Sequence, residues 1–167
     1  QAVHLFGRPD SLMADVFTQR PDAVTDDQLH VTLGYDGFRV VLHAGTMVPS
    51  PGPVIAVQGT TGAFVKYGED VQEAQLKSGL TPGGDGWGAD PTPAVFTRAD
   101  GETVQPPQAL PGLAGNYPAF YAGLAAAIRD GTPPPVAIDE TLLVTHLLDL
   151  ARQSAAEGRR LAVKWPQ

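Results

Sequence analysis

A cation, a phenol and two carboxylates lie close together after one predicted strand. The segment reads "GTTGAFVKYGEDVQEAQLKSG" (59–79), with Lys66 and Tyr67 at the strand end and Asp70 and Glu73 just beyond. Convergent polar groups beside an aromatic ring are typical of a ligand site. The same residues also have a structural interpretation, because an aspartate N-cap followed three residues later by glutamate is a helix-start pattern. The residue types alone leave both roles open.

Two histidines are brought opposite each other by a predicted hairpin. β-Rich runs flank Asp36-Gly37, the preferred type I′ turn, and this two-residue turn pairs His30 with His43. Two imidazoles could bind a metal, but a protein site needs a third or fourth ligand. The neighbouring Thr32 and Arg39 do not supply one, so we expect no metal here and keep a histidine metal protein as the weaker alternative.

The hairpin face that carries these histidines is predicted to be an interface with another subunit. It is semi-polar, and its candidate contact residues are Thr32, Arg39, Val41 and His43. The opposite face is wholly apolar and should meet the core. It pairs Tyr35 with Phe38, Leu33 with Val40, and Val31 with Leu42. We therefore expect a homo-oligomer.

Other motifs of enzymatic chemistry are weak or absent from the sequence. The loop "GDGWGA" (84–89) matches the dinucleotide fingerprint G-x-G-x-x-G/A. No predicted strand precedes it, and Asp90-Pro91 prevents a helix from following at once, so the phosphate-binding context is missing. The sequence has no cysteine and no G-x-S-x-G elbow, which excludes thiol nucleophiles and the usual hydrolase signal.

Composition limits the possible partners. The 167 residues suffice for one domain, with 43% apolar and 17% charged residues and a net charge of −7. Lysine and arginine are scattered, so we expect no nucleic-acid or membrane partner. No apolar run approaches the roughly 18 residues of a membrane span. The lack of cysteine fits a reducing compartment, and we expect a cytoplasmic protein.

The remaining elements indicate the fold class. The sequence predicts a terminal helical turn at 1–6, strands at 11–17, 54–58 and 63–67, a helix from Asp70 to about 78, an irregular loop at 81–93, and a second Asp-Gly hairpin at 94–105. Late in the chain it predicts a helix with an apolar stripe from Tyr117 to Ile128, a helix capped by Asp139 that carries Leu143, Leu147, Leu150 and Ser154 on one face, and a strand at 159–165. Hairpins followed by helices indicate an α+β domain, with an open, mostly antiparallel sheet and helices on one face.

The segment 59–76 resembles the C-terminal domain of the Gfo/Idh/MocA oxidoreductases, the family of glucose–fructose oxidoreductase and inositol dehydrogenase. The family segment reads approximately G-T-x-G-[ST]-[FY]-x-K-Y-G-x-D-x-Q-E. The matching residues are Gly59, Thr60, Gly62, Phe64, Lys66, Tyr67, Gly68, Asp70, Gln72 and Glu73, while Ala63 replaces a small hydroxyl residue. The opening residues 1–17 and the closing stretch 116–161 are also similar, so the resemblance spans nearly the whole chain.

The resemblance implies a domain of the type that follows the nucleotide-binding domain in glyceraldehyde-3-phosphate dehydrogenase. In this family an N-terminal Rossmann domain binds NAD or NADP, and a lysine of a Glu-Lys-Pro motif and a helix histidine handle the proton. Neither motif occurs here, where the lysines are Lys66, Lys77 and Lys164. We therefore expect residues 1–167 to be a single substrate and oligomerisation domain of a longer enzyme. The Rossmann domain would be absent, and the fragment would hold no catalytic or cofactor-binding residue and be inactive alone.

Two functional hypotheses follow. In the first, the chain belongs to an NAD(P)-dependent oxidoreductase acting on a sugar, cyclitol or related polyol, and Thr46, Lys66, Tyr67 and Trp87 contact this small-molecule substrate. Lys66 would donate to a hydroxyl, and Tyr67 or Trp87 would offer a ring face to sugar C–H groups. In the alternative, the chain is a non-catalytic binding or assembly module that uses the open face of the sheet.

Overall fold

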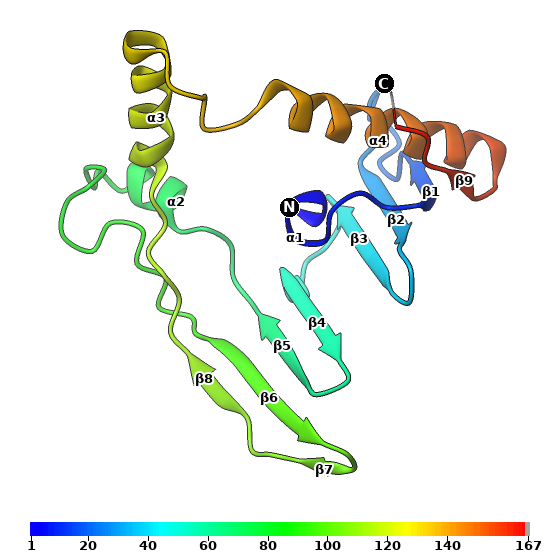
Figure 1. The fold of residues 1–167 in the computed structure, drawn as a ribbon, viewed down its shortest axis with the longest axis horizontal. Helices are drawn as coiled ribbons and strands as arrows, with labels where there is room; N and C mark the ends of the chain where they lie inside the picture. The colour runs from blue at the N-terminus through cyan, green and yellow to red at the C-terminus, as the bar shows by residue number, and fades with distance from the viewer. Residues whose placement is uncertain (166–167) are drawn as a thin grey trace. The chain divides into compact units, whose positions relative to one another are not determined.

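The chain forms two compact units in a computed structural model that describes residues 1–165 (Figure 1). Unit 1 comprises Gln1–Pro49 and Val136–Gln167, and unit 2 comprises Ser50–Pro135. Each unit has its own antiparallel sheet. No helix in the described part of the chain is long and apolar enough to cross a membrane.

Unit 1 is a four-stranded sheet covered by one long helix. Its strands, in the order β3-β2-β1-β9, are β3 Arg39–Gly45, β2 Gln28–Gly34, β1 Ser11–Phe17 and β9 Leu161–Ala162, and its helices are α1 Ala2–Phe6 and α4 Ile138–Glu157. The helix α4 lies along one face of this sheet (Figure 1). The core between them comprises Leu12, Ala14, Val31, Leu33, Tyr35, Leu147 and Ala151.

The register of the β2–β3 hairpin is the predicted one. His30 pairs with His43, and Val31 pairs with Leu42. The predicted turn type is wrong, because a type I′ turn needs a positive φ at both central residues and only Gly37, at +77°, has one. The strand pairing therefore fixes this register without the expected turn geometry.

The inward face of α4 is also as predicted, but the predicted start of α4 is wrong. Ala137 is the N-cap without a side-chain bond, and Asp139 lies in the first turn, where a carboxylate still favours the positive end of the helix dipole. Ser154 is fully buried. Its Oγ accepts from the backbone N of Ala14 at 3.0 Å and donates to the backbone O of Arg159 at 2.7 Å. One hydroxyl thus ties α4 to β1 and to the turn before β9.

Unit 2 is a five-stranded sheet with two helices. Its elements are β4 Ile55–Gly59, β5 Gly62–Lys66, α2 Gln72–Lys77, β6 Ala94–Asp100, β7 Thr103–Val104, β8 Gln108–Leu110 and α3 Tyr117–Asp130. The strand order is β4-β5-β6-β7, and β8 pairs with β6. The strand β8 was not predicted, because the adjacent Pro106-Pro107 argues against a strand.

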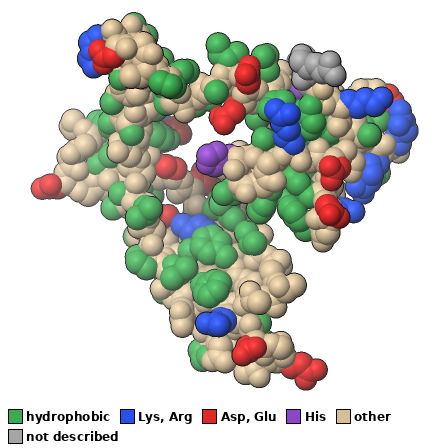
Figure 2. Space-filling view, in the orientation of Figure 1, with side chains coloured by type: hydrophobic (Ala, Val, Ile, Leu, Met, Phe, Trp, Pro, Cys, Tyr) green, Lys and Arg blue, Asp and Glu red, His purple; other side chains and the backbone are tan. Residues whose placement is uncertain are grey.

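The helix α3 has the predicted limits and an exposed apolar stripe. Asn116 caps its start by accepting from the backbone N of Ala119, and Gly131 ends it in the left-handed conformation. The stripe residues are between 38% and 80% exposed, and they are Tyr117, Phe120, Tyr121, Leu124 and Ile128. Hydrophobic side chains also lie at the surface over the strands of unit 2 (Figure 2).

The fold class is confirmed as α+β with open antiparallel sheets. The arrangement differs from the prediction in one respect, since the strands form two sheets rather than one. The Pro-rich corner 47–53 separates β3 from β4, and sequence patterns do not show whether the next strand continues the same sheet.

Candidate functional site

A lysine–aspartate pair lies where β5 ends. The Nζ of Lys66 donates to Oδ2 of Asp90 at 2.6 Å and to the backbone O of Tyr67. The Lys66 side chain is 17% exposed and that of Asp90 is 16% exposed. The two charges are therefore mostly removed from water, which strengthens their attraction relative to a surface pair.

The carboxylate of Asp90 is held on both oxygens. Its Oδ1 accepts from the backbone N of Thr92 at 2.8 Å. The hydrogen bond from Lys66, and after it the one from Thr92, lowers the pKa of Asp90, so the group is ionised at neutral pH. The sequence analysis missed Asp90 as a site residue. Its partner Lys66 lies 24 residues away, and only the local Asp-Pro-Thr turn pattern hinted that this carboxylate is ordered.

The aromatic side chain that follows Lys66 in the sequence is accessible. Tyr67 is 51% exposed and follows Lys66 directly. The chain then turns at Gly68, whose φ of +83° is a conformation that other residues rarely adopt. Unit 2 therefore holds the Lys66–Asp90 ion pair and, at the next position after Lys66, an accessible phenol ring.

Gln72 is the centre of a second polar cluster in unit 2. It is 1% exposed, and its Oε1 accepts from the indole Nε1 of Trp87 at 2.9 Å and from the backbone N of Tyr117 at 2.7 Å. Its Nε2 donates to both carboxylate oxygens of Asp70 at 3.1 and 3.0 Å. Indole can only donate and an ionised carboxylate can only accept, so these partners fix the orientation of the amide. Gln72 thereby joins α2, the 81–93 loop and the start of α3.

Close backbone packing completes the Gln72 cluster. The backbone N of Gly115 donates to the backbone O of Gly88 at 2.9 Å. A Cβ at Gly115 would clash with Nε2 of Gln72, and one at Gly88 would clash with the backbone of Gly115. Both positions thus require glycine.

The predicted capping box at the start of α2 is wrong. The helix begins at Gln72, its N-cap Val71 makes no side-chain bond, and Asp70 accepts from the backbone N of Gln72 at 2.8 Å. Glu73 pairs instead with Lys77 one turn later at 2.6 Å, and the hydrogen bond from Lys77 lowers the pKa of Glu73. The motif residues Asp70 and Gln72 therefore have a structural role, and Glu73 is a surface charge.

Trp87 lies inside this packing and is 7% exposed. Its ring N–H is already used by Gln72. The surrounding segment 84–89 lies among turns, and the elements next to it are the helix α2 before it and the strand β6 after it, the reverse of the strand-then-helix order. This geometry does not fit a dinucleotide, whose pyrophosphate needs a helix N-terminus after the glycine loop.

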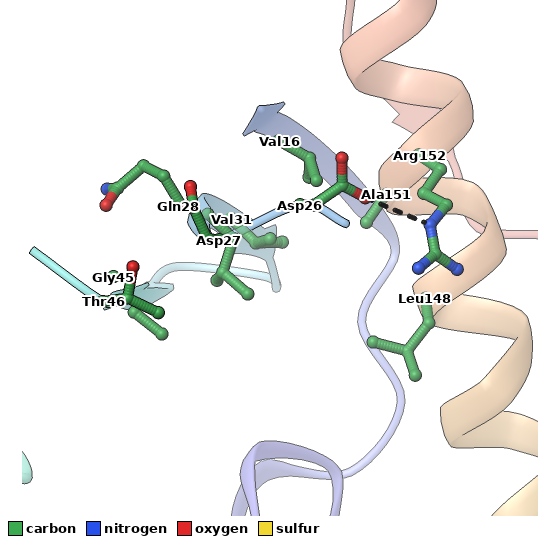
Figure 3. A pocket seen from close by; sticks show the side chains of 12 residues that line it. Val16, Asp26, Asp27, Gln28, Val31, Gly45, Thr46, Leu148, Ala151 and Arg152 are labelled. Carbon is green, nitrogen blue, oxygen red and sulfur yellow. Dashed lines mark ion pairs between the residues drawn. The ribbon is translucent and has the colours of Figure 1, made fainter. Parts of the chain in front are cut away.

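Thr46 lies in unit 1, at a cavity of about 390 Å³ between the sheet and α4 (Figure 3). The lining is mostly apolar and includes Leu29, Val31 and Leu148. An ion pair between Asp26 and Arg152, 3.6 Å apart, also lines it. Of the four predicted substrate residues, Lys66, Tyr67 and Trp87 thus belong to unit 2, and Thr46 belongs to unit 1.

The four predicted interface residues lie on the sheet face of unit 1 away from α4. Val41 is 55% exposed, Arg39 and His43 are exposed, and Thr32 is half-buried. Arg39 donates to the backbone O of Tyr35 at 2.8 Å, and the rings of His30 and His43 are 5.9 Å apart. No group of three or more His, Asp or Glu side chains that could hold a metal gathers within residues 1–165.

This fold defines the C-terminal domain of an oxidoreductase. Residues 1–163 match the family model described as "Oxidoreductase family, C-terminal alpha/beta domain", the GFO_IDH_MocA_C model. The chain belongs to this family, which confirms the resemblance seen in the sequence.

The relatives are about twice as long as this chain. It is 34% identical to the scyllo-inositol 2-dehydrogenase (NADP(+)) IolW of Bacillus subtilis (strain 168), over 98% of this chain and 46% of the relative. It is 36% identical to the uncharacterized oxidoreductase YdgJ of Escherichia coli (strain K12), over 98% of this chain and 47% of YdgJ. The solved structure of the putative oxidoreductase yvaA from Bacillus subtilis superposes with a TM-score of 0.91 at 34% identity, over 98% of this chain and 47% of the yvaA chain. The chain spans about half the length of these relatives.

Proposed function

We propose that this chain is the substrate-side domain of an NAD(P)-dependent oxidoreductase that acts on a sugar, cyclitol or related polyol. The observation that carries the proposal is the 34% identity, over 98% of this chain, to a relative named as a scyllo-inositol 2-dehydrogenase (NADP(+)). The full-length protein would reduce the nicotinamide, and this domain alone would be inactive. Because the chain contains no cysteine, which fits a reducing compartment, we also propose a cytoplasmic location.

The domain would bind and orient the substrate. The ammonium of Lys66 donates to one substrate hydroxyl, and the exposed ring of Tyr67 packs against substrate C–H groups. Trp87 holds Gln72 in place, and its direct contact with substrate stays a prediction. Thr46, at the cavity of unit 1, is a separate predicted contact.

The nicotinamide cofactor would supply the hydride chemistry from another part of the full-length protein. Within residues 1–165 the glycine-rich segment 84–89 does not have the strand and helix that a dinucleotide site needs. The residues of this chain therefore act in the proposal by binding and orienting the substrate.

Steady-state kinetics of the full-length protein test this proposal. Wild type should reduce NADP⁺ or NAD⁺ in the presence of inositols or sugars. Lys66→Met keeps the apolar stem and removes the charged donor, so KM should rise by about 10- to 100-fold with a smaller change in kcat. Lys77→Met is the matched control, because Lys77 is also ion-paired but its side chain is 74% exposed. Unchanged kinetics in the Lys66 variant would contradict the assigned role of Lys66.

A second candidate role is assembly through the outer face of the unit 1 sheet. The 55% exposure of Val41 on the edge strand β3, with the exposed His43 two residues further along the same face, favours this role, since an exposed apolar side chain in a surface patch can mark an interaction site. Sedimentation of the full-length protein over a range of concentrations tests this role. A monomer at every concentration would exclude it.

A further inference from the structure

We propose that a helix which precedes Gln1 in the full-length protein docks in the apolar cavity of unit 1, and that α1 is the last turn of this helix. The inference concerns how this domain is joined to the rest of the protein, and it does not depend on the polyol activity. The docked helix would cover the apolar part of the cavity lining. Thr46 is polar and exposed, so its predicted contact with substrate is a separate question.

The sheet of unit 1 has an apolar face that α4 covers only in part. The helix α4 packs against β1. On the face toward α4, Val31 pairs with Leu42 and Leu29 pairs with Ala44. Val31 is 7% exposed, but Leu42 is 39% exposed and Ala44 is also exposed. The apolar face therefore continues over β3, where α4 does not cover it.

The side of α4 that faces this region is apolar and exposed as well. Leu148 lines the cavity and is 57% exposed (Figure 3). The cavity has a volume of about 390 Å³, and most of its lining is apolar. Neighbouring helices pack about 8–10 Å apart, so a second helix beside α4 would bury Leu148 and the exposed residues of β3 together.

The C-terminal end of α1 is fixed at the hairpin end of this sheet. The ring of Phe6 lies 5.7 Å from that of Phe38. The hydroxyl of Tyr35 donates to the backbone O of Gly7 at 3.1 Å. Earlier in α1, Val3 packs against the core between the sheet and α4. The helix α1 therefore lies on the face of the sheet that α4 covers in part.

The direction of the chain aims the start of α1 at the cavity. Only residues 7–10 link α1 to β1, and the backbone N of Asp10 donates to the backbone O of Gly34 at 2.8 Å at the hairpin end. The strand β1 then runs from this end to Phe17, which pairs with Gln28 at the cavity. Because so short a link places a helix antiparallel to the strand that follows it, residues before α1 lie toward the cavity.

The distance from α1 to the cavity corresponds to about two helical turns. Along the strand direction, Tyr35 and Leu29 are about 20 Å apart at roughly 3.3 Å per residue. The 5 residues of α1 cover about 7.5 Å of this length. The remaining distance of about 12 Å requires about eight more helical residues. A segment of this length with apolar side chains on its inner side would fill the cavity.

The longer relatives indicate where this segment comes from. The chain matches a C-terminal domain model and spans 46% of IolW and 47% of YdgJ. The remainder of a longer protein of this kind precedes its C-terminal domain. A segment joined to α1 is held beside the cavity by the backbone and has a high effective concentration there, whereas a second copy or a free ligand loses translational freedom when it binds. We therefore assign the cavity to the adjoining segment.

Hydrogen–deuterium exchange of the full-length protein, read by mass spectrometry, tests the inference. The backbone amides just before Gln1 should be protected in the wild type. Leu148→Asp places a charge against the docked helix, so exchange in this peptide should become about tenfold faster or more. Leu142→Asp is the matched control, because Leu142 is also 57% exposed on α4 but lies about 120° around the helix from Leu148. It should change exchange in this peptide by less than about twofold.

The milder pair Leu148→Ala and Leu142→Ala should give the same order of effects, and it replaces the aspartate variants if these do not fold. Rapid exchange before Gln1 in the wild type, or equal effects of the Leu148 and Leu142 variants, would overturn the inference. Native mass spectrometry separates the other occupants. A small molecule or a second copy lost in the Leu148 variant, with exchange before Gln1 unchanged, would also overturn it. Protection before Gln1 that only the Leu148 variants lose supports the docked helix, whether or not the protein oxidises a polyol.

Discussion

Replacing Gln72 with leucine should destabilise unit 2 because the amide is buried and bonded on both sides. Leucine retains approximately the shape of the side chain. It removes the acceptor of the Trp87 indole N–H and of the Tyr117 backbone N–H, and it removes the donor to Asp70. At 1% exposure, no water is available at Gln72 to replace these bonds.

The size of the effect follows from the two buried N–H donors, of Trp87 and Tyr117, that lose their acceptor. A buried donor without a partner costs about 1–3 kcal/mol, so two cost about 2–6 kcal/mol. The more apolar leucine side chain returns about 1 kcal/mol. We expect a net loss of about 3 kcal/mol in the free energy of unfolding. With a urea dependence of about 2 kcal/mol per molar, the midpoint should fall by about 1.5 M.

Fluorescence provides a local assay. The chain has two tryptophans, so a Trp165→Phe background leaves Trp87 as the reporter. In this background Gln72→Leu should lower the urea midpoint seen at Trp87 and shift its native emission to longer wavelength. Gln58→Leu is the control, because Gln58 is exposed on β4, and it should change the free energy of unfolding by less than about 0.5 kcal/mol. Equal midpoints for the Gln72 and Gln58 variants would show that the buried hydrogen bonds of Gln72 do not stabilise unit 2.

Two further predictions concern unit 1. Ser154→Ala leaves the backbone N of Ala14 and the backbone O of Arg159 without their buried partner, and should lower the free energy of unfolding in urea by about 2–4 kcal/mol. Ser78→Ala is the control and should be neutral, because Ser78 is an exposed residue at the end of a helix. The pKa of Asp27 is lowered by hydrogen bonds to its carboxylate, first from the backbone N of Gln19 and then from Arg20. Its contribution to stability is therefore complete above the unfolded pKa of about 3.9, and it is lost as the pH falls through the lower pKa of the folded state. Asp27→Asn should therefore unfold more easily than wild type at neutral pH, the two unfolding midpoints should converge in acid, and a constant difference from pH 7 to pH 2 would contradict this role of Asp27.

Local features of this fold could be predicted from the sequence. The β2–β3 register and the ends of α1 and α3 depend on residues close in the chain, and glycines at 7 and 131 mark both helix ends. The inward face of α4 followed from the helical spacing of Leu143, Leu147, Leu150 and Ser154. These features are determined by neighbours within one or two turns, which is the range that sequence patterns describe.

The candidate site could be predicted only in part. Lys66 stood out by its place at a strand end, but Asp90 was missed because 24 positions separate the two residues, and these include the helix α2 and part of the 81–93 loop. The bonds that Gln72 makes to Trp87 and to Tyr117 span 15 and 45 residues. No period or turn pattern encodes pairings of this kind, since they depend on how α2, the 81–93 loop and the start of α3 pack together.

A crystal structure of the full-length protein with a bound inositol would show directly whether Lys66 and Tyr67 contact the substrate. We expect one ring hydroxyl oxygen within hydrogen-bond distance of the Nζ of Lys66, and ring C–H groups packed against the exposed ring of Tyr67. An inositol bound in the full-length protein without contact to Lys66 or Tyr67 would overturn the proposed substrate-side role of these residues.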